Sequence, residues 1–214
     1  MIYVLSDIHG NYKHFKSILG KINLQSTDTL YILGDVIDPN GIDILFEIMK
    51  MPNAKMTLGN HEYLMLKGLA ENSDKLNEWH SRNGDTTHNE FSKLTKTEQE
   101  TIIEFIKNLP LDYQVSVNGK NYWLTHCLIK NSLGITSSVI TFSRIENDLE
   151  INNDYTVIFG HTPTKYYQNN NPLEVYYGEN RIGIDCGSGY KEDSEYKGRL
   201  ACIRLDDMKV FYSN

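Results

Sequence analysis

Residues 29–38 read Thr-Leu-Tyr-Ile-Leu-Gly-Asp-Val-Ile-Asp, a short apolar run that stops at a glycine and two acids. The chain opens in the same way, because the apolar residues 2–5 lead directly into Ser-Asp-Ile-His-Gly at 6–10. A short apolar run bounded by turn residues is typical of a strand buried inside a protein. Both stretches therefore predict a buried strand that ends in polar, chemically active side chains.

Amphipathic stretches with helical periodicity separate these runs along the first half of the chain. In order, we predict a strand at 2–5, a helix at 12–22, a strand at 29–33, a helix at 42–49, a strand at 55–58 and a helix from 62 to about 70. Strands that alternate with helices of this length favour βαβ units and a largely parallel sheet. The pattern therefore predicts an α/β fold.

The second half of the chain has a different pattern. Residues 71–109 are predicted to be helical, ending at Pro110. The pair Asn118-Gly119 is a strong turn signal between two apolar runs and predicts an antiparallel hairpin. The strands predicted beyond Pro110 lie at 113–117, 121–125, 156–159, 173–177, 181–185, 200–205 and 209–212. No linker is evident, so we expect residues 1–214 to form one mixed α/β domain.

The composition excludes several classes of protein. Lys and Arg number 21 and Asp and Glu number 28, which gives the 214-residue chain a formal net charge of −7. That sign argues against binding nucleic acid or an anionic membrane through bulk charge. Three cysteines cannot all pair, which favours a reducing cytoplasm as the location. No apolar run approaches the ~20 residues of a membrane span.

Polar residues gather where five of the predicted strands stop. The clusters are SDIHG at 6–10, GDVID at 34–38, GNHE at 59–62, TH at 125–126 and GHTP at 160–163. Ligands of open α/β sheets bind at the carboxyl ends of the strands, so these clusters are expected to converge on one site.

The clusters contain a set of oxygen and imidazole ligands, namely Asp7, His9, Asp35, Asn60, His126 and His161. Such a set suits a hard or borderline divalent metal ion. Six ligands exceed what one catalytic ion with an open position uses, so a shared carboxylate could bridge two ions.

The order of these motifs resembles a known family. Asp-x-His-Gly, Gly-Asp-x-x-Asp, Gly-Asn-His-Glu, a lone His and Gly-His-Thr form the signature of the metallophosphoesterases. The chain is most similar to their phosphoprotein-phosphatase branch and its bacterial Ser/Thr phosphatase-like members. Trp79 followed by Asn83-Gly84, and the later stretch 184–187, are also similar to that bacterial group. The resemblance implies a four-layer αββα sandwich in which two mixed sheets face each other and helices cover the outside.

The resemblance also implies roles for the matching residues. The first metal ion would be held by Asp7 and His9, Asp35 would bridge, and the second ion would be held by Asn60, His126 and His161. The expected cofactors are two divalent ions, manganese first, while iron and zinc suit the same ligands. His61 would be the general acid, oriented by Asp38, and both Asn60 and His61 would contact the phosphate group.

These roles match the chemistry of phosphoester hydrolysis. Phosphate esters hydrolyse slowly because their anionic centre repels nucleophiles. Two cations about 3.5–4 Å apart lower the pKa of a bridging water, which becomes the nucleophile, and neutralise phosphoryl oxygens in the transition state. An alkoxide leaving group needs a proton, which a histidine can supply near neutral pH.

Phosphate binding departs from the family's pattern. Eukaryotic-like members have arginines where this chain has Pro39 and Leu58. Bidentate arginines are the natural clamp for a phosphate dianion, so their absence weakens the protein-phosphatase interpretation. Arg144, which lies between the two ligand histidines, is the residue predicted to bind phosphate instead.

We expect a cytoplasmic, metal-dependent phosphatase that acts on a phosphorylated substrate and resembles Ser/Thr protein phosphatases. A diadenosine polyphosphate or another nucleotide is the alternative substrate. A non-catalytic scaffold of the same fold is the alternative from another class. Among the remaining polar residues, Glu62 is predicted to be a first-turn helix acid. Three histidines match no motif and are predicted to face solvent: His14, His80 and His88.

Overall fold

The computed structural model describes residues 1–70, 73–130, 136–140, 142, 144, 151, 154–190 and 195–214. Its first half contains β1 (Ile2–Leu5), α1 (Tyr12–Ile22), β2 (Thr29–Ile32), α2 (Ile42–Met49), β3 (Ala54–Met56), α3 (Asn60–Leu69), α4 (Ser73–Trp79), a π-helical turn (His80–Gly84), α5 (Asp85–Ser92) and α6 (Lys96–Lys107). Its second half contains β4 (Asp112–Val117), β5 (Lys120–Thr125), β6 (Leu128–Lys130), β7 (Thr136–Ser138), β8 (Thr156–Phe159), a 3₁₀ turn (Thr164–Tyr166), β9 (Tyr176–Gly178), β10 (Arg181–Gly183), β11 (Ala201–Arg204) and β12 (Lys209–Tyr212).

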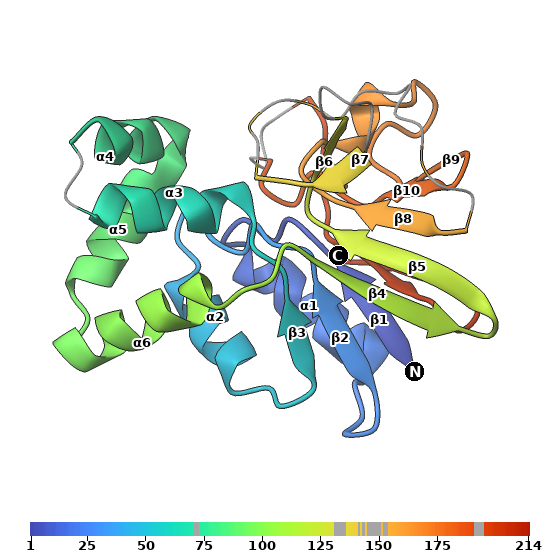
Figure 1. Ribbon diagram of the computed structural model, residues 1–214, viewed down its shortest axis with the longest axis horizontal. Coiled ribbons are helices and arrows are strands. Elements are labelled where there is room, and N and C mark those ends of the chain that lie inside the picture. Colours follow the sequence, from blue (N-terminus) through green and yellow to red (C-terminus); the bar gives the residue numbers. More distant parts are fainter. Residues whose placement is uncertain are drawn as a thin grey trace.

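Two five-stranded sheets form the centre of the molecule (Figure 1). The first has the order β12-β11-β1-β2-β3, with β1, β2 and β3 parallel and β11 antiparallel to β1. The second has the order β4-β5-β8-β10-β9, with β5, β8 and β10 parallel and the edge strands antiparallel. The expectation of an α/β fold with two mixed sheets is confirmed.

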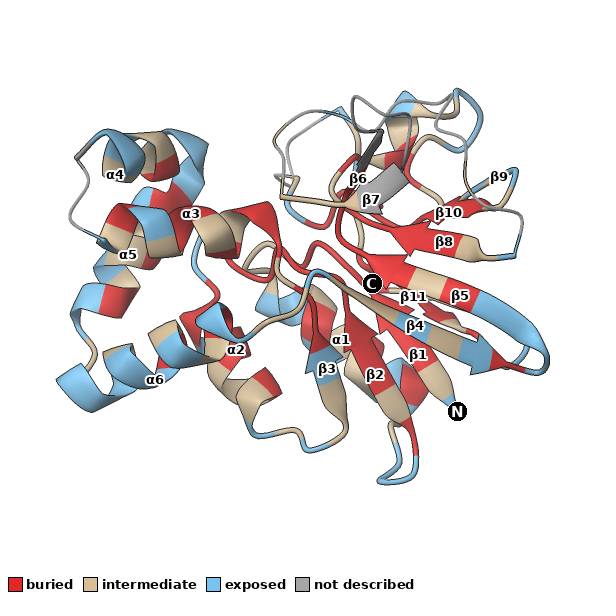
Figure 2. Ribbon diagram, viewed as in Figure 1, coloured by how far each residue is buried: buried red, intermediate tan, exposed pale blue. Residues whose placement is uncertain are grey.

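Alternation along the strands explains why the sheets face each other. Successive side chains of a strand point to opposite faces of its sheet. In β1, Val4 packs against residues of the second sheet such as Leu124 and Ile158. Its neighbours Tyr3 and Leu5 point the other way and pack against the helices. A continuous apolar run therefore buries both faces of this strand (Figure 2).

Helices α1 and α2 pack on the outer face of the first sheet, and α3 to α6 form a helical lobe beside β3 (Figure 1). Helix α1 buries Phe15, Ile18 and Ile22, which recur at helical spacing. The Asn11 side chain caps its first turn by accepting the His14 N–H. None of the helices in the described residues is long and apolar enough to span a membrane.

The outer face of the second sheet has a different cover. Val157 and Phe159 pack there with Tyr167 and Tyr176, beside Cys127 at the end of β5. In the part of the chain that the structure describes, this cover contains one 3₁₀ turn, where the resemblance implied a helical layer. The small sheet of β6 and β7 lies on the same side and was not predicted.

Most predicted elements match the structure, and one strand is wrong. The helices at 12–22 and 42–49 have the predicted bounds. The strand predicted at 173–177 is a turn until residue 176, because the Glu174 N–H bonds to the Asn171 carbonyl at 3.0 Å. Leu173 and Val175 are buried nonetheless, since they anchor this turn to the core. Burial of apolar side chains in a loop imitates the pattern of a strand.

Candidate metal centre

The loops that follow five strands converge at one end of the two sheets. Asp7 and His9 follow β1, Asp35 follows β2, His126 follows β5 and His161 follows β8. Asn60 and His61 open α3, directly after β3. β1, β2 and β3 run parallel in the first sheet, and β5 and β8 run parallel in the second. The carboxyl ends of these strands therefore lie at the same edge of each sheet, as expected from the sequence.

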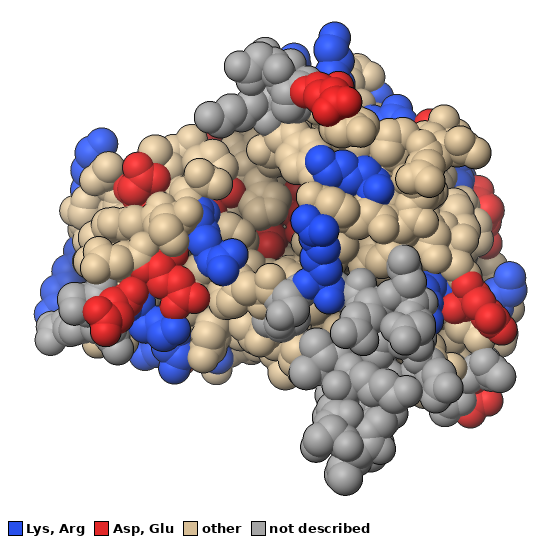
Figure 3. All heavy atoms as spheres, turned by 90° about the horizontal axis from the view of Figure 1, so that it is seen from above, with Lys and Arg blue, Asp and Glu red and all other residues tan. Residues whose placement is uncertain are grey.

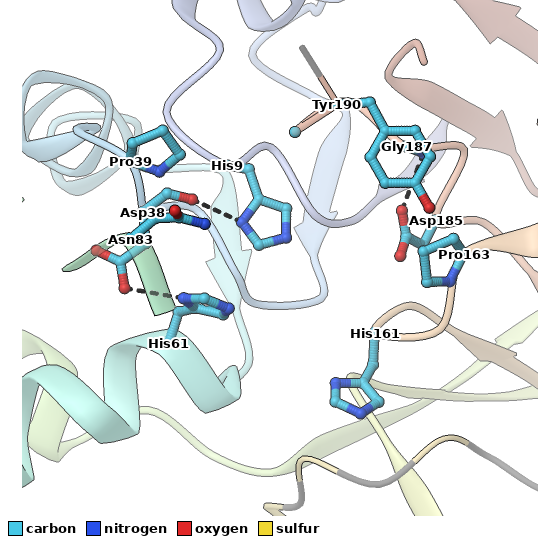
Figure 4. A pocket seen from close by; sticks show the side chains of 11 residues that line it. His9, Asp38, Pro39, His61, Asn83, His161, Pro163, Asp185, Gly187 and Tyr190 are labelled. Carbon is cyan, nitrogen blue, oxygen red and sulfur yellow. Dashed lines mark hydrogen bonds and ion pairs between the residues drawn. The ribbon is translucent and has the colours of Figure 1, made fainter. Parts of the chain in front are cut away.

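A cleft of about 230 Å³ lies where the loops meet. Its walls include the side chains of His9, His61 and His161. Asp38 and Asp185 lie on opposite sides of the cleft (Figure 4). No Lys or Arg is among the described residues that line it. Seen from above, the molecule is hollowed near its centre, with acidic side chains inside and Lys and Arg side chains on its border (Figure 3).

The buried carboxylate of Asp35 lies at the centre of the cluster. Its Oδ2 atom is 3.3 Å from His126 Nε2 and 4.0 Å from the Nε2 atoms of both His9 and His61. Asp35 belongs to two groups of potential metal ligands, one with His9 and His61 and the other with His126 and His161. In each group the ligand atoms lie within 4.8 Å of one another.

The imidazole rings are held so that one nitrogen faces this centre. His9 Nδ1 donates to the Asp38 carbonyl at 2.8 Å, and His126 Nδ1 donates to the Leu33 carbonyl at 2.6 Å. These bonds leave Nε2 of both rings directed toward Asp35. A backbone acceptor on the far nitrogen is the usual way to orient a metal-binding histidine.

Asn60 and Asp7 join the two sheets at the centre. The Asn60 Oδ1 atom lies 2.8 Å from His126 Nε2 and 2.6 Å from His161 Nδ1. The His161 backbone N–H donates to both carboxylate oxygens of Asp7 at 3.0 Å, and Asp7 Oδ1 is 3.9 Å from His9 Nε2. All six residues predicted as ligands therefore lie in one cluster.

The backbone at the cluster is unusual. Five non-glycine residues adopt left-handed φ values of 50° to 66°: Asp7, His9, Asp35, Asp38 and His161. Each such residue costs about 1–3 kcal/mol, and strain of this kind gathers at functional sites. Gly34 and Gly59 allow the loops to approach, because a Cβ on Gly34 would lie 2.6 Å from the Gly59 backbone.

His61 and Asp38 form a second feature of the cleft. His61 Nδ1 lies 2.8 Å from Asp38 Oδ2, and the Trp79 indole N–H donates to the same oxygen at 2.8 Å. Burial alone would lower the pKa of His61. The charge of Asp35 and the bond to Asp38 outweigh burial and raise this pKa to about 9. Both interactions therefore favour the protonated form of the imidazole.

The charges of the cluster compensate one another. Burial would raise the pKa of Asp35, but His126 and His61 outweigh it and hold this pKa well below its usual range. Burial would lower the pKa of His126, but Asp35 raises it to about 10. Asp7 and Asp185 are less well compensated. Burial raises the pKa of Asp7 to about 7, and burial together with Asp7 raises that of Asp185 to about 8.

These residues fit divalent cations. Carboxylate and amide oxygens with imidazole nitrogens form a donor set that manganese, iron and zinc accept. The oriented rings of His9 and His126 and the carboxylate shared by both groups are further features of metal sites. A nearby cation would also stabilise the ionised forms of the buried acids Asp7 and Asp185.

Glu62 has a larger role than the sequence indicated. It is fully buried, and its carboxylate accepts N–H bonds from four backbone groups at 2.8–3.3 Å. Three of the donors lie in the loop after β2, at Asp35, Val36 and Ile37, and the fourth is Gly59. Glu62 thus joins the loops that carry Asp35 and Asn60.

Replacing Glu62 with glutamine is expected to destabilise the fold. The amide group places N–H donors against two backbone N–H groups, and each unsatisfied donor costs about 1–3 kcal/mol. The free energy of unfolding should fall by about 2–6 kcal/mol, as measured by urea denaturation. Glu100→Gln is the control, because Glu100 is exposed and its pair with Lys96 contributes little. Equal small losses in both variants would contradict this role of Glu62.

Arg144 and three further histidines lie outside the cluster. Arg144 is exposed, its guanidinium stacks on Tyr166 at 3.5 Å, and it is not among the described residues lining the cleft. The prediction that three histidines face solvent is confirmed only in part, because His14, His80 and His88 are each half-buried. His80 Nε2 lies 3.0 Å from His88 Nδ1.

Sequence reasoning missed Asp185 and Tyr190 in the walls of the cleft. Asp185 lies in the stretch 184–187, which was noted only as a point of similarity. The position of an acid at the end of a predicted strand, close to where Asp35 stands after its own, is the signal that could have identified it. No comparable signal marks Tyr190.

Known proteins resemble this chain over most of its length. The calcineurin-like phosphoesterase family model matches residues 1–186. A symmetrical bis(5'-nucleosyl)-tetraphosphatase of Proteus mirabilis is 33% identical over 85 residues, 36% of this chain and 31% of that protein. Serine/threonine-protein phosphatase 2 of Escherichia coli is 27% identical over 205 residues, 87% of each protein. A solved metallophosphoesterase structure from Sphaerobacter thermophilus has a TM-score of 0.56 and 16% identity, covering 99% of this chain and 87% of that chain.

These similarities differ in what they establish. The chain spans less than a third of the length of the Proteus mirabilis tetraphosphatase. The solved structure, at 16% identity, supports the fold alone. The family model, in contrast, covers residues 1–186 and therefore every residue of the cluster. The chain thus belongs to the calcineurin-like phosphoesterase family.

Proposed function

We propose that this chain is a metal-dependent phosphoester hydrolase that binds two divalent cations, one on each side of Asp35. The observation that carries the proposal is the buried Asp35 carboxylate, which two groups of candidate ligands share. The first cation would be held by Asp7, His9 and Asp35, and the second by Asp35, Asn60, His126 and His161. Manganese is the metal that we propose first, with iron or zinc as alternatives.

His61 is proposed to be the general acid and not a metal ligand, although it forms a group of potential ligands with His9 and Asp35. His9 and His126 direct Nδ1 to a neutral backbone carbonyl, whereas the partner of His61 Nδ1 is a charged carboxylate. This carboxylate, that of Asp38, stabilises the charged form of the ring. Nε2 is then free to donate a proton to the oxygen of the leaving group.

Bound cations would activate a water and neutralise phosphoryl oxygens. The protein's own groups complete the reaction. Asp35 places a negative charge between the imidazoles, and the Asn60 amide oxygen lies 2.8 Å and 2.6 Å from ring nitrogens of His126 and His161, so that all three can bind the same cation. His61 protonates the departing oxygen, and Asp38 keeps the ring oriented while it does so. Asn60, His61 and Arg144 are proposed to contact the phosphate group.

Two substrate classes remain in this proposal. The first is a phosphomonoester on serine or threonine of a protein, supported by the 87% coverage of the Escherichia coli protein phosphatase. The second is a diadenosine polyphosphate or another nucleotide, supported by the 33% identity to the tetraphosphatase. The three cysteines are buried and unpaired, which supports a cytoplasmic location.

Hydrolysis of p-nitrophenyl phosphate tests the proposed activity. The protein is expected to hydrolyse it when manganese is added and to lose that activity when a chelator removes the metal. A lack of metal-dependent hydrolysis would favour a non-catalytic scaffold. A panel of phosphopeptides and nucleotides, assayed with manganese, then separates the two substrate classes by kcat/KM.

A further inference from the structure

The Asp38 carboxylate uses only one of its oxygens. Oδ2 accepts bonds from both the His61 ring and the Trp79 indole, each at 2.8 Å. Oδ1 is buried and has no hydrogen-bond partner among the residues that the structure describes. The side chain itself is fully buried, so solvent does not compete for these bonds. Two donors on one oxygen determine how the carboxylate is rotated.

The second donor comes from α4, a neighbouring helix of the lobe. Trp79 ends α4, 41 residues beyond Asp38 in the sequence, and its side chain is fully buried. Gly68 and Gly84 pack on its ring, because a Cβ on Gly84 would lie 2.2 Å from the indole Nε1 and a Cβ on Gly68 would lie 3.1 Å from Cε3. The ring of His88 lies on it as well, at 5.4 Å between centroids.

An indole is well suited to hold a carboxylate beside an acid. Its N–H is a donor only and does not ionise, so it cannot take the proton that His61 must deliver. A bond to a charged acceptor is also stronger than a bond between neutral groups. Without this donor, the carboxylate could turn about its Cβ–Cγ bond and offer His61 a different oxygen or a different angle.

We propose that Trp79 is a positioning residue for the general acid, which acts by fixing the carboxylate of Asp38 that orients His61. This inference rests on the proposed phosphoesterase function. It assigns part of the catalytic support to α4 of the helical lobe, whose residues lie outside the motifs that carry the candidate ligands.

Trp79→Phe removes the indole N–H and retains an aromatic ring. Loss of the hydrogen-bond partner of a metal-binding side chain typically costs about 10–100-fold in metal affinity or activity. We expect a loss at the lower end of this range for Trp79, which is a hydrogen-bond partner of Asp38. We expect kcat for an alkyl phosphate to fall about tenfold, with KM unchanged, because only the protonation of a poor leaving group needs a positioned acid. The kcat for p-nitrophenyl phosphate, whose leaving group needs little protonation, should stay within about twofold.

A double variant tests whether Trp79 acts through His61. Groups that work as a unit show strongly non-additive effects. In the His61→Asn background, Trp79→Phe should therefore have no further effect on alkyl phosphate hydrolysis. A further tenfold loss in that background would overturn the proposal, as would equal losses on alkyl and aryl substrates in the single variant.

Gly84→Ala tests the same contact without altering Trp79. The φ of Gly84 is −81°, which alanine accepts, so the added methyl acts mainly by displacing the indole. The same loss confined to the alkyl phosphate is expected. Gly20→Ala is the matched control, because a Cβ there meets no atom within 4 Å. Normal alkyl phosphate turnover in Gly84→Ala would overturn the proposal even if Trp79→Phe fails to fold.

Hydrolysis by the wild-type protein distinguishes a failure of this inference from a failure of the proposed function. If it hydrolyses neither substrate with manganese, the function itself is wrong. If it hydrolyses both and the variants show no selective loss on the alkyl phosphate, the function stands and the role of Trp79 is wrong. Thermal unfolding and metal content, measured on each variant, show that the comparison is made between folded, loaded proteins.

Discussion

Asp35→Asn is expected to abolish metal-dependent hydrolysis and to prevent the protein from holding two ions at once. Asparagine retains the shape of the side chain but lacks the charge and one of the acceptor oxygens. Three imidazole nitrogens lie within 3.3–4.0 Å of the Asp35 carboxylate, so the substitution removes the negative charge that all three share. Metal content by mass spectrometry and turnover of p-nitrophenyl phosphate check this result.

Asp43→Asn is the control for that experiment. Asp43 is an exposed acid in the first turn of α2, where its charge contributes about 0.3–1 kcal/mol through the helix dipole. It should bind metal and turn over substrate as the unaltered protein does. If Asp35→Asn still binds two ions tightly, the ions do not share this carboxylate.

His61→Asn is expected to bind metal normally but to lose kcat by about 10²–10⁴ on alkyl phosphates. The loss on p-nitrophenyl phosphate should be much smaller, because a nitrophenolate leaves without a proton. The structural basis is the pair of His61 and Asp38, with Nδ1 2.8 Å from the carboxylate. Steady-state kinetics on both substrates measure the difference.

His14→Asn is a matched control for this variant. His14 lies on α1, hydrogen bonds to Ser188 at 3.0 Å and is not among the described residues that line the cleft. Its replacement should leave both activities unchanged. Equal losses of His61→Asn on the alkyl and the aryl substrate would argue against an acid role and for a role in metal or phosphate binding.

Much of the fold was predictable because local pattern and burial agree. In α1, apolar residues at helical spacing, the cap at Asn11 and the left-handed Asn23 all favour the same eleven-residue helix. In β1, a run of apolar residues with turn residues after it is typical of a buried strand. The false strand at 173–177 shows where this agreement fails, because Leu173 and Val175 are buried by a turn.

The candidate site was predictable for the residues that follow strands. Parallel strands bring their ends to one edge, which is why the loop of Asp7 lies beside that of Asp35 in one sheet, and the loop of His126 beside that of His161 in the other. No comparable rule predicts contacts between segments that are far apart in the sequence. The bond from Trp79 to Asp38 depends on how the helical lobe packs against the loop after β2. The four bonds to Glu62 depend on the approach of two loops, which sequence pattern does not encode.

The backbone conformation also helps to determine where the side chains of the candidate metal centre lie. Asp7, His9 and Asp35 adopt left-handed φ values in the loops that follow β1 and β2. His9 lines the cleft, and the carboxylates of Asp7 and Asp35 are buried within 4.0 Å of its Nε2 atom. The strain of these conformations is offset by bonds such as those of Glu62 to the loop after β2.

A crystal grown with manganese, with diffraction recorded at the manganese absorption edge, tests the metal centre most directly. We predict two anomalous peaks about 3.5–4 Å apart, with the Asp35 carboxylate between them. Asp7 and His9 should contact one peak, and Asn60, His126 and His161 the other. A single peak, or peaks that do not contact Asp35, would contradict the account.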